Sequence, residues 1–360
     1  MRKTRLSFSS VSIEKDKRSN VGEHTPAHRE EYKHGERKNI SKNSTYQYVK
    51  KGFGGKRSGG RSFGNNNNKT GNKTKVETKI PPVEEGTIRV IPLGGVEEVG
   101  RNMILVESEH DIVVLDVGFH FIDEEEAMGA DFTLPNFKYL EERKEKIRAV
   151  AITHGHLDHI GGIPFIMERI GNPPIYAQNL TTLMIKKRQE EFPTHTPLTM
   201  HIVDKDSVIR FNELSLGFFP VFHSIPDSMG VKVITPYGNI LVSGDMKLEH
   251  EGSRPTAIEE KKWTTLGKDK NILMIADSTS SEIPGFSISE KEVQKNIENI
   301  IRTTEGRLII GTFASQFDRM IKIVQICEQF NKKIIPEGRS IKNNLEIAKL
   351  AGLLKPKDDT

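Results

Sequence analysis

The stretch THGHLDHIGG, from Thr153 to Gly162, places three histidines and one aspartate within six residues. It begins where the apolar run KIRAVAITH (146–154) ends, and such a run is typical of a buried strand. Its two glycines lead into IPFIMERIG (163–171), whose spacing predicts a short helix that stops at its glycine. Imidazoles and carboxylates bind metals, and a loop fixed between a strand and a helix holds them in place while leaving them open to substrate. The stretch therefore predicts a metal site at a strand end.

Two metal ions fit the spacing of these ligands. The H-x-H pair, His154 and His156, can direct two imidazoles at one metal, while Asp158 and His159 face a second. A histidine-rich surface loop without metal is the alternative, but it gives no reason for the position directly after a buried strand. One short segment can therefore begin two neighbouring sites.

Two metal ions need further ligands, and later strands offer them. His223 closes the β-like run LSLGFFPVFH (214–223), and Asp245 closes NILVSGD (239–245). Either residue alone would more often be an ordinary polar residue at a strand end. Beside the HGHLDH segment they complete a set of nitrogen and oxygen ligands.

Length and composition restrict the class of protein. The 360 residues allow a sizeable core and two domains. No apolar run reaches the roughly 18 residues of a membrane span, and the first residues lack the apolar segment of a secretory signal. We therefore expect a cytoplasmic protein that contacts no membrane. Cys327 is the only cysteine, which excludes an internal disulfide framework and a thiolate metal cluster.

Residues 1–80 differ in charge from the rest of the chain. They carry 20 Lys and Arg against 7 Asp and Glu, a net charge of +13; because the whole chain has a net charge of +4, the body is acidic at −9. The segment is poor in apolar residues and rich in Gly, Asn and Lys, so we expect a disordered arm. Its aromatic residues between 46 and 63 lie among basic ones, which suits phosphates and unpaired bases. A solubilising extension fits the same composition.

From Thr87 onward, short apolar runs alternate with turn signals. Such runs predict strands, and the first three are TIRVIPLGG (87–95), NMILVES (102–108) and DIVVLDVG (111–118). Further β-like runs continue as far as NILMIADS (271–278). We therefore expect a β-rich domain over residues 81–288.

Beyond Ile288 the elements become longer and alternate. Ser289 and Glu292 form a capping-box pattern that opens a helix. The runs that follow predict a strand, a helix, a strand and a helix, at 307–314, 317–330, 332–338 and 342–352. This alternation predicts a parallel, Rossmann-like layer, and its pattern stops at Thr360 without completing strands. We expect a second, partial domain at 289–360.

Together these segments resemble a known family. THGHLDHIGG, with Asp116 in VVLDVG, His223 in HSIPD and Asp245 in SGDMK, is similar to the metallo-β-lactamase superfamily. Across the rest of the body, PLGGVEEVGRNM, ADSTSSEIPGFSISE, TFASQFDR and EGRSIKNNLEIAKLAG look like ribonuclease J, a member of the β-CASP branch. The resemblance implies an αββα sandwich followed by an incomplete Rossmann-like β-CASP domain, and it leaves the arm outside.

The resemblance also implies a role for each ligand. It assigns one zinc ion to the histidines His154, His156 and His223, a second to Asp158 and His159, and a bridge between them to Asp245. It places Asp158, His159 and Asp116 in the catalytic centre: Asp158 would orient the nucleophile, and Asp116 would orient the ligand loop without coordinating. A simple turn residue is the alternative for Asp116. Manganese is the alternative to zinc, because His and Asp ligands serve both metals.

For the second domain, the resemblance implies contacts with single-stranded RNA. Four residues of TFASQFDR and EGRS are the expected contacts with the RNA backbone: Ser315, Arg319, Arg339 and Ser340. Arginine suits phosphate recognition, but each of the four would equally cap a helix or pair on the surface. Two positions depart from the family pattern, because Ser280 stands where Asn is common and Asp318 where His is common.

The leading interpretation is a dinuclear, metal-dependent RNA phosphodiester hydrolase. The family is both endonuclease and 5′–3′ exonuclease, acting in rRNA processing and mRNA decay, and we expect a homo-oligomer for the full-length protein. The family's later His-x-Ser-Gly-His segment is absent before Thr360, so we expect a fragment that binds metal without efficient turnover. A hydrolase of the same fold acting on thioesters or lactams, and an RNA-binding piece with a vestigial site, are the alternatives.

Overall fold

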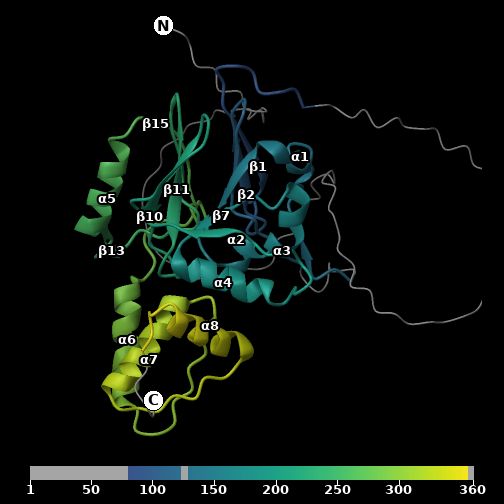
Figure 1. Ribbon diagram of the computed structural model, residues 1–360. Helices are drawn as coiled ribbons and strands as arrows, with labels where there is room; N and C mark the ends of the chain where they lie inside the picture. Colours follow the sequence, from purple (N-terminus) through teal and green to yellow (C-terminus); the bar gives the residue numbers. More distant parts are fainter. Residues whose placement is uncertain (1–79, 123–128, 356–360) are drawn as a thin grey trace, which may run out of the picture. The chain divides into compact units, whose positions relative to one another are not determined.

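The computed structural model describes residues 80–122 and 129–355. The expected arm at 1–80 therefore lies outside the described residues, apart from Ile80. The described part is a mixed α/β structure built around two β-sheets (Figure 1). This confirms the α/β class expected from the short apolar runs.

The first sheet contains six strands. They are, in spatial order, β1 (Arg89–Gly94), β2 (Met103–Glu107), β3 (Ile112–Leu115), β6 (Ile147–Ala151), β7 (Ile175–Ala177) and β8 (Met200–Ile202). The first three strands pair antiparallel, whereas β3, β6, β7 and β8 run parallel. Strands β3 and β6 consist of Ile, Val, Leu and Ala with a single Arg and are almost wholly buried, as expected of strands covered on both faces.

Helices connect the parallel strands of this sheet. They are α1 (Lys138–Glu141), α2 (Leu157–Ile160), α3 (Ile163–Ile166) and α4 (Asn179–Gln189), with 3-10 turns at Lys144–Lys146 and Met167–Ile170. The helix predicted over 163–171 forms as α3 and the turn that follows it. It ends at Gly171, whose φ of 90° lies in the left-handed region that glycine adopts without strain.

The second sheet contains five strands. They are β9 (Val208–Arg210), β10 (Ser215–Pro220), β11 (Met229–Thr235), β12 (Gly238–Val242) and β15 (Asn271–Ile275). Strands β9 to β12 form an antiparallel meander, and β15 joins β12 in parallel. Helix α5 (Ala257–Gly267) precedes β15. Two short antiparallel pairs complete the β-structure: β4 (His120–Phe121) with β5 (Phe132–Thr133), and β13 (His250–Glu251) with β14 (Arg254–Pro255).

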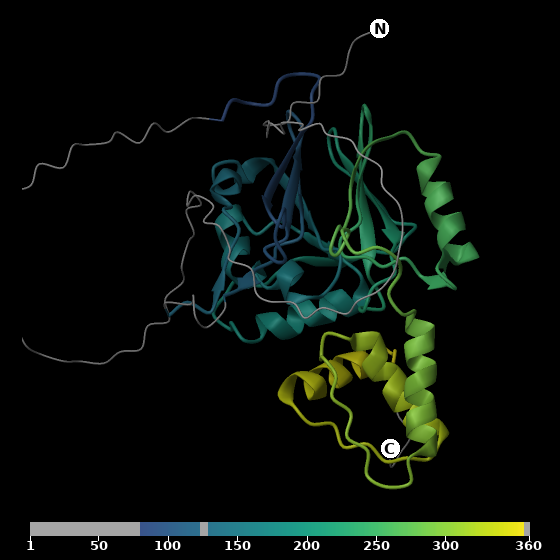
Figure 2. The ribbon, with the colours of Figure 1, turned by 180° about the vertical axis from the view of Figure 1, so that it is seen from behind.

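Three hydrophobic clusters hold the layers together. Between the sheets, residues such as Val113 of β3 pack with Leu216 of β10 and Val231 of β11. The other face of the first sheet packs against the helices α1 to α4, and the outer face of the second packs against Trp263 of α5. Figures 1 and 2 show the resulting order of helix, sheet, sheet and helix. The αββα sandwich expected from the resemblance is confirmed.

The region after Ile288 is helical in the described residues. It contains α6 (Glu290–Thr303), α7 (Phe317–Gln329) and α8 (Arg339–Leu350). Ser289 caps α6, and its side chain accepts a hydrogen bond from the backbone N–H of Glu292, which confirms the predicted start of this helix. Helices α7 and α8 share a core with Leu180 of α4 and Ile225.

The two strands predicted in this region are wrong. No strand forms at 307–314 or 332–338, and several apolar residues there are exposed, including Ile309 (87%), Phe313 (78%) and Ile335 (82%). A strand needs a neighbour that takes up its backbone hydrogen bonds, and among the described residues neither segment has one. The domain boundaries at 80/81 and 288/289 stay predictions. Within the described ranges, no helix combines the length and the apolar character needed to cross a bilayer.

Candidate metal centre

Strand ends bring the predicted ligands to one place. Strands β3 and β6 are parallel neighbours, so their carboxyl ends meet at one edge, where Asp116 follows β3 and the histidine loop follows β6. In the second sheet, His223 follows β10 and Asp245 follows β12. The two sheets face each other, and the four segments converge between them. Ligands that are far apart in the sequence thereby become neighbours.

The first ligand group contains three histidines and one aspartate. The Nε2 atoms of His154 and His223 lie 3.0 and 3.2 Å from Nδ1 of His156. The Oδ2 atom of Asp245 lies 3.9 Å from Nε2 of His154 and 3.7 Å from Nε2 of His223. One atom from each of the four residues lies within 4.8 Å of the others. Such a cluster of lone pairs is stable only with a cation or a proton at its centre.

The second ligand group shares Asp245 with the first. Nε2 of His159 lies 3.2 Å from Oδ1 of Asp245 and 3.4 Å from Oδ2 of Asp158. The two oxygens of Asp245 therefore face different groups. Asp158, His159 and Asp245 again bring one donor atom each within 4.8 Å.

Asp116 contacts the ligand loop on the side away from the donor atoms. Its Oδ2 accepts a hydrogen bond from Nδ1 of His159 at 2.8 Å, and its Oδ1 accepts one from the backbone N–H of Thr153, also at 2.8 Å. The hydroxyl of Thr153 donates to the same carboxylate. Asp116 is buried and has a φ of 61°, a left-handed conformation that costs energy for a residue other than glycine. The structure thus places Asp116 against the ligand loop and away from the converging donor atoms.

Outer contacts decide which nitrogen of a histidine is free to bind a metal. Nε2 of His156 lies 3.1 Å from the backbone carbonyl of Ser315, and a carbonyl only accepts, so Nε2 carries the proton. The lone pair of His156 is therefore on Nδ1, which faces the ligand group. Nδ1 of His159 likewise donates to Asp116, which leaves Nε2 as the nitrogen that faces the second ligand group.

Asn102 is a site residue that the sequence reasoning missed. Its amide nitrogen lies 3.1 Å from Nε2 of His159 and 3.4 Å from Oδ2 of Asp158. It also donates to the backbone oxygen of Asp158. In the sequence it begins the run NMILVES (102–108), which was predicted as a strand, and no local pattern marks it as a site residue.

Burial and mutual repulsion keep the first three histidines neutral. Burial, followed by the charges of neighbouring histidines, holds the pKa of His154 well below 6.5, and burial lowers that of His156. The pKa of His223 falls to about 4 for the same reasons. Neutral imidazole is the form that binds a metal.

Asp245 is ionised, whereas His159 carries a proton. Burial alone would raise the pKa of Asp245, but the hydrogen bond and charge of His159 outweigh it and lower the pKa to about 2. Burial by itself would lower the pKa of His159, but the charge and hydrogen bond of Asp116 outweigh burial and raise the pKa of His159 well above 6.5. A cation at Nε2 of His159 would therefore have to displace a proton.

A pocket of about 130 Å³ opens beside the second ligand group. It is lined by Asp158, His159 and Asp245 together with Asn102 and Asp277. Asp277 is held by the backbone N–H groups of Met246 and Thr279. The ligand groups are therefore open to a small molecule on this side.

The four expected RNA contacts have different surroundings. Ser315 touches the centre, but through its backbone carbonyl. Arg319 is engaged by Glu290 in a two-pronged ion pair, with N–O distances of 3.0 and 2.8 Å. Arg339 and Ser340 are exposed at the start of α8. Their contact with RNA stays a prediction.

The donor set fits metal ions. Three neutral imidazoles and a shared carboxylate form one group, and three donors form the other, which leaves coordination positions open as in catalytic sites. Nδ1 of His156 and Nε2 of His159 also face the ligand groups. A metal-binding centre is therefore consistent with the chemistry of the residues themselves.

Comparison with known proteins gives the family. The model of the metallo-beta-lactamase superfamily matches residues 96–272, and the model of the ribonuclease J beta-CASP domain matches residues 305–360. The chain belongs to the ribonuclease J branch of the metallo-β-lactamase superfamily. The resemblance inferred from THGHLDHIGG and the later segments is thus confirmed.

Relatives of this ribonuclease J-family chain cover most of its length. Ribonuclease J 2 of Staphylococcus epidermidis and of Staphylococcus aureus is in each case 34% identical over 272 residues, which is 75% of this chain and 48% of the relative. The chain thus spans about half the length of the curated relatives it matches. Among solved structures, a protein of unknown function from Enterococcus faecalis has a TM-score of 0.51 at 18% identity and covers 69% of this chain and 70% of its own. At that identity the likeness concerns the fold alone.

Proposed function

We propose that this chain carries the dinuclear metal centre of an RNA phosphodiester hydrolase. The observation that supports it most is the sharing of Asp245 between two ligand groups, with one carboxylate oxygen facing each. Relatives named ribonuclease J 2 support RNA as the substrate. We infer both endonucleolytic and 5′–3′ exonucleolytic cleavage of single-stranded RNA, in rRNA processing and mRNA decay, by a cytoplasmic homo-oligomer.

In this proposal each ligand has a defined role. His154, His156 and His223 hold one ion, Asp158 and His159 hold the other, and Asp245 lies between them. Two bound zinc ions, or manganese ions, would supply a hydroxide at neutral pH and neutralise charge on the phosphate. The side chains of the second group are held in position by Asn102, Asp116 and Thr153.

The chain's own residues also position the nucleophile. Although burial raises the pKa of Asp158, the hydrogen bond and charge of His159 lower it below its ordinary value, so this carboxylate is ionised at neutral pH. An ionised carboxylate accepts a hydrogen bond from an attacking water and holds its oxygen toward phosphorus. The amide of Asn102 fixes the carboxylate from the other side.

Metal content and RNA cleavage measured on the same preparations test this proposal. We expect two equivalents of zinc in the purified chain, and slow cleavage of a 5′-monophosphorylated oligoribonucleotide with added zinc that is lost in His156→Ala. His201→Ala is the matched control, because His201 is an exposed histidine on β8 that stacks on Tyr176 away from the ligand groups. Cleavage that persists in His156→Ala at the level of the control would overturn the proposal.

Two competing functions are tested by the same material. Hydrolysis of a thioester or a β-lactam with no cleavage of RNA would favour a small-molecule hydrolase of this fold. RNA binding without hydrolysis under any metal condition would favour an RNA-binding piece with a vestigial site. Deletion of residues 1–80 should leave cleavage in place, because all the proposed ligands lie outside that arm.

A further inference from the structure

A second pocket shares a wall with the metal centre. It has a volume of about 280 Å³, at the lower end of the range for small-molecule sites. Phe222 and Lys247 line it, and they adjoin the ligands: Phe222 precedes His223, and Lys247 comes two residues after Asp245. The backbone N–H of Lys247 donates to the carbonyl of Phe222 at 2.7 Å, which joins the two segments in a short bridge. The same bridge therefore separates the pocket from the metal centre.

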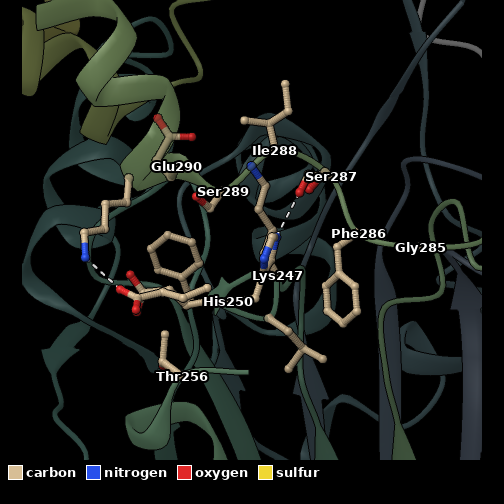
Figure 3. A pocket seen from close by; sticks show the side chains of 14 residues that line it. Lys247, His250, Thr256, Gly285, Phe286, Ser287, Ile288, Ser289 and Glu290 are labelled. Atoms are coloured by element: carbon tan, nitrogen blue, oxygen red, sulfur yellow. Dashed lines mark hydrogen bonds and ion pairs between the residues drawn. The ribbon is translucent and has the colours of Figure 1, made fainter. Parts of the chain in front are cut away.

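The linker between β15 and α6 forms the opposite wall. In Figure 3 its residues from Gly285 to Glu290 arch over Lys247 and His250. The imidazole of His250 donates from Nε2 to the carbonyl of Ser287 at 2.9 Å, which ties the linker to the β13–β14 pair. The pocket is thus formed by two segments that hold each other in place.

One cation of this pocket has no partner in the part of the chain that the structure describes. The acidic residues Glu251 and Glu290 are paired with Lys291 and Arg319. Lys247 is exposed and makes no ion pair there. Glu249 is the remaining acidic residue of the lining. Lys247 therefore offers a positive charge on the side of the pocket nearest the ligand groups.

The N-terminus of α6 adds donors beside this cation. Helix α6 is 14 residues long, and Ser289, its N-cap, lines the pocket with Glu290 and Lys291. The Ser289 side chain accepts a hydrogen bond from the N–H of Glu292. The two N–H groups before it, those of Glu290 and Lys291, have no partner within the helix, and such groups favour an anion. A phosphate group suits a place where an unpaired lysine and a helix N-terminus line the same pocket.

The exposed Phe286 and the partly buried His250 form the other side. The Phe286 side chain is 47% exposed, and its ring centroid is 4.8 Å from that of His250. Exposed aromatic rings next to basic groups stack on the bases of single-stranded nucleic acids. A flat base would cover the apolar face of Phe286 that water now contacts.

We propose that this pocket binds one nucleotide of the RNA strand, adjacent to the nucleotide whose phosphate occupies the metal centre. Lys247 and the first turn of α6 bind the phosphate, and Phe286 with His250 stacks on the base. This inference rests on the proposed RNA-hydrolase function. It adds a subsite outside the ligand groups, and it explains why a cation and an aromatic ring are left exposed beside them.

Binding of a short fluorescent oligoribonucleotide to the full chain, in the presence of a chelator that prevents cleavage, tests the subsite. We expect Phe286→Ala to weaken binding about 5- to 150-fold, the range for loss of one stacked base. Lys247→Met should reduce the slope of log Kd against log salt concentration by about 0.7, the value for one phosphate contact on a single strand. Both side chains are exposed, so neither change threatens folding.

Lys261→Met is the matched control, because Lys261 is an exposed lysine on α5 outside the pocket. A second readout is photocrosslinking, where an oligoribonucleotide carrying 4-thiouridine should label the peptide that contains Phe286. Binding and crosslinking in both pocket variants that equal those of the control would overturn the subsite, even if the chain cleaves RNA. Conversely, weaker binding in the pocket variants of a chain that never cleaves RNA would retain the subsite and refute the hydrolase function.

Discussion

Replacement of Asp116 by asparagine separates the support of the metal centre from the stability of the fold. Asp116 accepts hydrogen bonds from the backbone and hydroxyl of Thr153 and from Nδ1 of His159. Asparagine has nearly the same shape and keeps one acceptor oxygen, but its NH₂ group cannot accept from His159. The imidazole then moves its proton to Nε2, the atom that should bind the metal. Asp116→Asn therefore weakens the second ligand group without removing a ligand.

The expected magnitude follows from this loss of orientation. Substitution of a residue that orients a metal ligand typically lowers metal affinity 10- to 100-fold, which is about 1.4 to 2.7 kcal/mol. The first ligand group reaches Asp116 only indirectly, through Thr153 and through His159 beside the shared Asp245, and should keep most of its affinity. Titration of the metal-free chain with zinc in competition with a chelating indicator resolves the two sites. We expect one nearly unchanged and one weakened site.

Asp111 provides a matched control at the other end of the same strand. Asp111 and Asp116 flank β3, and both are buried. The carboxylate of Asp111 accepts from Arg148, from Asn212 and from two backbone N–H groups, at 2.7 to 3.2 Å. Asp111→Asn should therefore lower thermal stability and leave zinc affinity unchanged. The reasoning is refuted if Asp116→Asn binds two zinc ions as tightly as the unaltered chain, or if both variants lose affinity equally.

Three further outcomes follow from the structure. Burial and neighbouring histidines lower the pKa of His223 in the folded chain to about 4, so as pH falls the unfolded chain protonates this imidazole before the folded chain does. The metal-free protein should therefore lose stability as pH falls from about 6.5 to about 4. A melting temperature that stays constant over this range would contradict the prediction. Asn102→Ala should lower zinc affinity at the second ligand group and leave the first unchanged, as measured in the same chelator competition. Gly118→Ala should lower the free energy of unfolding by about 1–3 kcal/mol, because a Cβ there would lie 1.6 Å from the backbone oxygen of Asp158. Gly267→Ala is the control: Gly267 has open space around it, so chemical denaturation should give an unchanged free energy of unfolding.

The sequence predicted most of the first sheet and the position of the histidine loop because both depend on local patterns. Apolar runs gave β3 and β6, and the histidine loop followed directly from the end of β6. The role of Asn102 was not predicted, because it depends on a contact with His159, which lies 57 positions further along the chain. The hydrogen bond from His156 to the backbone carbonyl of Ser315 was not predicted either. It also joins residues far apart in the chain, and every residue has a backbone carbonyl. Such contacts leave no residue-type signal in a single sequence.

The failed prediction of strands at 307–314 and 332–338 shows where local patterns stop being sufficient. RLIIGTFA and KKIIPEG contain the β-branched residues of buried parallel strands, yet Ile309, Phe313 and Ile335 are more than three-quarters exposed. A helix such as α6 satisfies most of its backbone hydrogen bonds by itself, so its capping box and apolar face were enough to predict it. A strand satisfies its backbone only through a neighbour, and a parallel strand needs that neighbour at a distance in sequence. The β-propensity of a segment therefore predicts where a strand is possible, but the strand forms only where a neighbouring strand pairs with it.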